Sequence, residues 1–88
     1  MISKEVMLTN KLGIHVRPAS LIAKTASGYK SEFIIRKNSM EVNGKSVMGI
    51  MMLAAGYLTK LELIINGVDE TELMNEIVRL FENKFGEE

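Results

Sequence analysis

The sequence predicts an α+β domain in which three helices cover one face of a four-stranded, mainly antiparallel sheet. The hydrophobic spacing switches several times between strict alternation and helical periodicity, which gives the order βαββαβα. The alternating segments have one apolar face each, so they need a cover on that side only. In this open-faced sandwich, another strand is expected between the two strands of the first βαβ unit, because this keeps the crossover right-handed.

Alternation of apolar and polar side chains marks the strands. Four segments show it and are predicted as strands: 2–9, 32–37, a short one near 40–43, and 60–65. The side chains expected to face the core are Val6, Leu8, Phe33, Ile35, Leu61, Leu63 and Ile65. A tight turn is predicted at Asn38-Ser39, and Gly67 is expected to end the last strand.

Helical spacing and breaker residues mark the first two helices. The first is predicted over 16–27, where Ala19, Ile22, Ala23 and Ala26 share one face. Pro18 fits only the first turn, where its missing N–H is not needed, and Gly28 is a natural stop. A short second helix is predicted over roughly 47–53, with Ser46 as its N-cap.

The last helix has the strongest pattern. Asp69 and Glu72 have the spacing of a capping box. One apolar stripe follows, made of Leu73, Ile77, Leu80 and Phe81. Lys84 is predicted in the last turn, where it favours the helix dipole, with Gly86 after it.

Composition narrows the class of protein. The 88 residues predict one domain over 1–88, and 11 basic residues balance 11 acidic ones, which argues against a nucleic-acid binder. The absence of cysteine excludes disulfides and thiolate sites, and the single histidine excludes a multi-histidine metal site. With no signal peptide and no membrane-spanning run, we expect a cytoplasmic monomer without a cofactor.

The segment 13–20, which reads GIHVRPAS, has the features of a phosphate site. Gly13 allows a sharp turn, and His15 falls at or just before the first helical residue. The unpaired N–H groups and the dipole at a helix start favour an anion there. Arg17 adds a guanidinium that can bind phosphate oxygens in a fork, and Pro18 stiffens the turn. The segment therefore predicts a phosphoryl group on the His15 imidazole.

This segment resembles the active-site signature of the HPr family, the histidine-containing phosphocarriers of the bacterial sugar phosphotransferase system. The usual signature has alanine where this chain has Val16. The resemblance implies that His15 accepts phosphate on Nδ1 (a pros-phosphohistidine) from enzyme I and passes it to IIA components. It implies that Arg17 stabilises the phosphate, together with the backbone N–H groups of Val16 and Arg17. Such a protein is a stoichiometric carrier rather than a turnover enzyme.

A second segment, 44–49 (GKSVMG), is open to two interpretations. On its pattern alone, Ser46 is an ordinary N-cap and the methionines after it fill the core. The segment is also similar to the pattern of HPr proteins regulated by HPr kinase/phosphorylase, which implies phosphorylation of Ser46 and a catabolite-control transcription factor as a further partner. The resemblance further implies a partner-docking surface made of Ser20, Lys24, Val47, Met48 and Met51.

Three other functions stay open from the sequence. A regulatory module could act through phosphorylated Ser46 alone, but the HPr-like regulator of catabolite repression lacks the active-site histidine that this chain has as His15. A carrier of the nitrogen-related branch of the system is disfavoured by the segment around Ser46. In a generic interaction domain, His15 would be an incidental surface residue.

Overall fold

The sheet is fully antiparallel, and its strands lie in the order β1-β4-β2-β3. Its strands are β1 (Ile2–Met7), β2 (Glu32–Lys37), β3 (Met40–Asn43) and β4 (Lys60–Asn66). The computed structural model describes residues 1–87, so the end of the predicted domain at residue 88 lies outside it. The expected insertion is confirmed, because β4 lies between β1 and β2.

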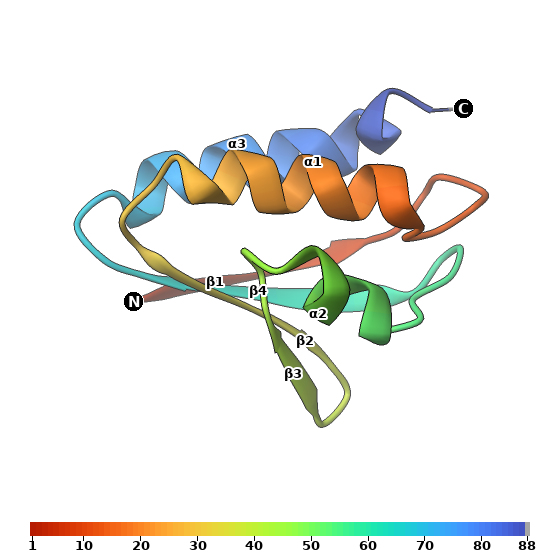
Figure 1. Cartoon of the computed structure of the whole chain (residues 1–88), viewed down its shortest axis with the longest axis horizontal. Helices are drawn as coiled ribbons and strands as arrows, with labels where there is room; N and C mark the ends of the chain where they lie inside the picture. The colour runs from red at the N-terminus through yellow and green to blue at the C-terminus, as the bar shows by residue number, and fades with distance from the viewer. Residues whose placement is uncertain (88) are drawn as a thin grey trace.

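Three helices complete the domain: α1 (Val16–Ser27), α2 (Val47–Met52) and α3 (Glu70–Glu82). Figure 1 shows α1 and α3 side by side over one face of the sheet. The short α2 packs against α1 and β3. The predicted α+β class and the βαββαβα order are confirmed.

The core lies between the sheet and the two long helices. Strand register places Phe33 opposite Ile65 and Ile35 opposite Leu63, so the predicted inward residues of β2 and β4 form one apolar layer. Three alanines of α1 are buried in the same core, and this helix lies close to α2 and α3. From α3, the buried side chains are Leu73, Met74, Ile77, Val78 and Phe81.

The first strand is shorter than the sequence predicts, because it ends at Met7 rather than at residue 9. Leu8 is nevertheless fully buried, and its backbone still pairs with the segment just before β4. Its N–H donates to Thr59 O at 3.0 Å, and its carbonyl accepts from Leu58 N at 2.7 Å. Leu58 has a φ of +67°, outside strand geometry, so the regular ladder stops there while the core continues.

The capping box predicted at the start of α3 is wrong. Within the described residues, the Asp69 side chain makes no cap hydrogen bond and instead accepts from the N–H groups of Lys30 and Ser31, both at 2.9 Å, and from the Ser31 hydroxyl. Glu70 accepts from Gly67 N at 3.1 Å in place of Glu72. Asp69 therefore ties the start of α3 to the loop before β2, a contact that local spacing cannot reveal.

This loop contact predicts a pH-dependent stability. The hydrogen bond from the Ser31 hydroxyl, helped by the Lys30 N–H, lowers the pKa of Asp69 below its ordinary value. A lowered folded-state pKa adds stability above the unfolded-state pKa, and this stability is lost as the pH falls through the folded-state value. Asp69→Asn should therefore destabilise the protein near neutral pH, and the difference from the parent should shrink below about pH 4.

Urea unfolding from pH 7 to pH 2 measures this difference. Glu72→Gln is the matched control, because Glu72 is exposed and lies in the same helical turn. A destabilisation by Asp69→Asn that stays constant over the whole pH range would contradict the prediction.

The end of α3 also differs from the expectation. The helix ends at Glu82, and Lys84 lies outside it, in a 3-10 turn over Lys84–Gly86. Lys84, Phe85 and Gly86 have positive φ angles of +54°, +57° and +76°, so the chain reverses direction. Phe85 is buried by this reversal, and its ring packs edge-on against Phe81 with the ring centroids 5.0 Å apart. The turn directs the C-terminal residues back toward the N-terminus of α1.

Candidate functional site

His15 is the N-cap of α1, as the sequence predicts, with extended backbone angles of φ −111° and ψ −168°. Its carbonyl accepts the hydrogen bond from Ala19 N at 3.1 Å. The earlier N–H groups of the first turn, on Val16 and Arg17, have no acceptor in the helix, and Pro18 has no N–H. Two backbone donors and the positive end of the helix dipole are thus available to an anion beside His15.

The loop before His15 is held by backbone contacts. Gly13 has a φ of +67°, and Ile14 donates its N–H to Ala55 O at 2.9 Å. The fully buried Asn10 closes the loop, because its Nδ2 donates to Gly13 O at 2.7 Å. The backbone just before His15 is therefore tied to the segment between α2 and β4.

Glu87 is a site residue that the sequence did not reveal. Its Oε2 lies 2.7 Å from His15 Nε2, and its Oε1 accepts from Asn10 Nδ2 at 3.0 Å. The Asn10 hydrogen bond, followed by His15 and Arg17, lowers the pKa of Glu87 below its ordinary value. His15 and Glu87 are 72 positions apart, so no local pattern points to this contact.

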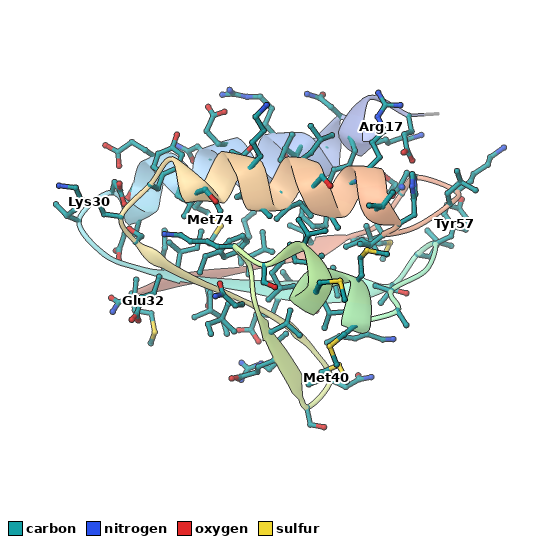
Figure 2. All side chains as sticks on the ribbon, viewed as in Figure 1. Arg17, Lys30, Glu32, Met40, Tyr57 and Met74 are labelled. Carbon is teal, nitrogen blue, oxygen red and sulfur yellow. The ribbon has the colours of Figure 1, made fainter. Side chains whose placement is uncertain are left out.

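An open pocket of about 450 Å³ lies in front of these groups. Its lining is formed by Lys11, Leu12, His15, Arg17 and Glu87. The His15 side chain is 35% exposed, and Arg17 is exposed on the side of the molecule where the C-terminal segment ends (Figure 2). The pocket offers an imidazole and two cationic side chains to a ligand from solution, which suits a phosphoryl group.

The second predicted site lies on α2. Ser46 is its N-cap, because the hydroxyl accepts from Gly49 N at 3.0 Å, and the helix ends at Met52, one residue earlier than expected. The interpretation of the methionines as core filler is wrong, since Met48 and Met52 are 74% and 67% exposed and Met51 is also exposed. Sequence reasoning did not include Met52 in the docking surface.

The remaining predicted docking residues lie on two helices. Ser20 and Lys24 are exposed, and they lie on the same face of α1 as the exposed Val16, each four positions after the one before. Because Val16 is 57% exposed, its larger side chain takes little part in the core. Val47 differs from the other four predicted docking residues, since it is partly buried and packs against the core.

Among residues 1–87, no three His, Asp or Glu side chains lie together as a metal site would require. Within the same residues, no helix has the length and apolar character needed to cross a bilayer.

The chain is similar to HPr proteins over nearly its whole length, in sequence and in structure. Residues 2–83 match the family described as "PTS HPr component phosphorylation site". Phosphocarrier protein HPr of Treponema pallidum is 44% identical over all 88 residues, and that of Neisseria meningitidis serogroup A is 45% identical over 87, covering 99% of this chain and 98% of the relative. The crystal structure of HPr-C-His from Thermoanaerobacter tengcongensis superimposes with a TM-score of 0.96 at 41% identity, covering 100% and 99% of the two chains.

The fold and the site define a non-catalytic phosphoryl carrier, with a histidine at a helix N-terminus. The chain belongs to the HPr family of phosphocarrier proteins and has that family's role in the phosphoryl relay of the phosphotransferase system. Membership of this family implies enzyme I and the IIA components as partners.

Proposed function

We propose that the chain, acting as one domain over 1–88, accepts a phosphoryl group from enzyme I on His15 Nδ1 and passes it to IIA components. The observation that carries the proposal is the placement of His15 at the N-cap of α1, beside Arg17 and two N–H groups that no helical carbonyl accepts. These groups compensate a dianion at the imidazole without requiring a metal.

The transfer step balances without a co-reactant. The Nδ1 lone pair attacks phosphorus, the new N–P bond forms, and the bond to the donor breaks with its electron pair leaving on the donor. Passing the group to an acceptor repeats this step with His15 as the leaving group. Arg17 and the two N–H groups stabilise the charge on the phosphoryl oxygens as it moves.

Partners dock on exposed side chains beside this site. Val16, Ser20 and Lys24 supply one face of α1, and α2 packs against that helix and adds Met48 and Met51. Flexible, polarizable methionines suit a surface that receives several different proteins. Val47 contributes at the edge of this surface, because it is partly buried and packs against the core.

The test is an incubation with enzyme I and labelled phosphoenolpyruvate. The parent protein should acquire an acid-labile label that transfers to a IIA component and that maps to Nδ1 of His15. Failure to acquire acid-labile label, under conditions where a known carrier is labelled, would refute the proposal.

Ser46 is proposed as the regulatory phosphorylation site for HPr kinase/phosphorylase. Ser46 is partly exposed at the start of α2, and a phosphate on its hydroxyl adds about −1.5 to −2 charge close to Met48 and Met51. Aspartate is a good N-cap, so Ser46→Asp keeps the helix start while adding negative charge. We expect it to slow phosphoryl acceptance from enzyme I by about tenfold, because the charge opposes docking.

Initial rates of His15 labelling measure this effect. Ser39→Asp is the matched control, because Ser39 lies exposed in the β2–β3 turn. Equal labelling rates for Ser46→Asp and the parent would contradict regulation at this position. The phosphorylated form is further proposed to bind a catabolite-control transcription factor, which pull-down with and without the phosphate tests.

A further inference from the structure

We infer that Glu87 is a positioning residue for phosphoryl transfer, because its carboxylate holds the His15 ring with hydrogen on Nε2 and the lone pair on Nδ1. The inference rests on the proposed function and names a residue that acts through His15. It is carried by the 2.7 Å contact between Glu87 Oε2 and His15 Nε2, made by a side chain that is 13% exposed.

The chemistry of this contact selects one tautomer. An ionised carboxylate can only accept hydrogen bonds, so Nε2 must be the donor. The lowered pKa of Glu87 keeps this carboxylate ionised at neutral pH. In a neutral imidazole with hydrogen on Nε2, the lone pair is on Nδ1. The contact therefore leaves Nδ1 as the nucleophile.

Two separate features hold Glu87 in place. The fully buried Asn10 donates to its other oxygen at 3.0 Å, which fixes the plane of the carboxylate. The chain reaches this position through Lys84 and Phe85, which adopt the left-handed conformation although neither is a glycine. Such angles persist where the surroundings stabilise them, and here the buried Phe85 ring against Phe81 does so.

The same contact assists the reaction itself. When Nδ1 bonds to phosphorus while Nε2 keeps its hydrogen, the ring becomes cationic. Glu87 lies next to Nε2 and stabilises this positive charge, as a carboxylate behind a histidine does in hydrolase triads. When the group leaves for an acceptor, the ring returns to neutral with the same tautomer, so no proton needs to move in either direction.

Glu87→Ala tests this inference in the full-length chain. Nitrogen-15 NMR of His15 reads the tautomer directly, and rapid-quench labelling by phosphorylated enzyme I reads the rate at saturating donor separately from KM. We expect the Nε2–H tautomer to dominate in the parent and to lose its dominance in the variant. The saturating rate should fall by about tenfold, since charge-assisted hydrogen bonds at partly exposed sites contribute on this scale, with KM little changed.

Glu82→Ala is the matched control. It removes the same charge from the exposed end of α3, at a side chain that lies outside the pocket lining. Thermal unfolding of both variants checks that the fold is retained. A saturating rate equal to the parent's, an unchanged tautomer population, or a loss confined to KM would each overturn the inference. Absence of label on the parent would instead refute the proposed function, while the tautomer measurement still tests the contact with Glu87.

Discussion

Replacement of His15 by alanine is expected to abolish phosphoryl transfer from enzyme I. No other histidine exists in the chain, and the neighbouring Arg17 cannot accept the group as a stable carrier. Loss of a nucleophile removes the covalent intermediate altogether, so the acid-labile label should fall by at least about a thousandfold. The measurement is label incorporated from phosphoenolpyruvate at fixed enzyme I.

Val16→Ala is the control for this experiment, because it changes the adjacent exposed residue to the one usual in the family signature. It should be labelled to the same extent as the parent, although its rate with individual partners can differ. The fold of His15→Ala should persist, since the side chain is partly exposed and its contacts are with Glu87 rather than the core. Residual acid-labile label on His15→Ala would contradict the assignment of His15.

Replacement of Gly13 by alanine is expected to cause a large loss of stability. A Cβ at this position would lie 2.6 Å from Ala55 O and 2.8 Å from Gly56 Cα, both backbone atoms that cannot rotate away. The φ of +67° adds conformational strain for any residue with a side chain. We expect a loss of about 2–4 kcal/mol in the free energy of unfolding, and a fall in Tm of roughly 10 °C or more.

Gly56→Ala is the control, because among the described residues nothing lies within 4 Å of a Cβ built there. It should change the free energy of unfolding by less than about 0.5 kcal/mol. Chemical denaturation of the two variants and the parent measures the difference. Equal stabilities of Gly13→Ala and Gly56→Ala would show that the loop can relax, and would contradict the close packing of the His15 loop against the segment after α2.

The elements that sequence reasoning predicts correctly have local causes. Alternation at Phe33, Ile35 and the apolar residues of β4 depends on the pleat of each strand, and α1 depends on helical spacing and Pro18. The Ser46 cap is also local, because its partner is Gly49, three positions away. These features agree with the structure because neighbours along the chain decide them.

Two of the wrong predictions, those for Asp69 and Lys84, have a common physical reason. Asp69 and Glu72 have the spacing of a capping box. The Asp69 side chain instead accepts hydrogen bonds from Lys30 and Ser31, in the loop between α1 and β2. Lys84 has the positive charge that favours the last turn of a helix. The helix nevertheless ends before Lys84, because the chain turns there and buries Phe85. In both cases a tertiary contact replaces the one that the local pattern predicts. The spacing of residues along the sequence contains no information about that contact.

The proposed phosphate site depends partly on local sequence and partly on tertiary packing. Gly13, His15, Arg17 and Pro18 lie within six positions, so the sequence alone determines the histidine, its helix N-terminus and the cation beside it. The contact between His15 Nε2 and Glu87 depends on how the sheet and the helices pack. Asn10 follows β1 and Glu87 follows α3, and the fold brings these two ends of the chain together at His15. Their separation of 77 positions leaves no periodicity or motif to detect, because only tertiary packing brings the two together.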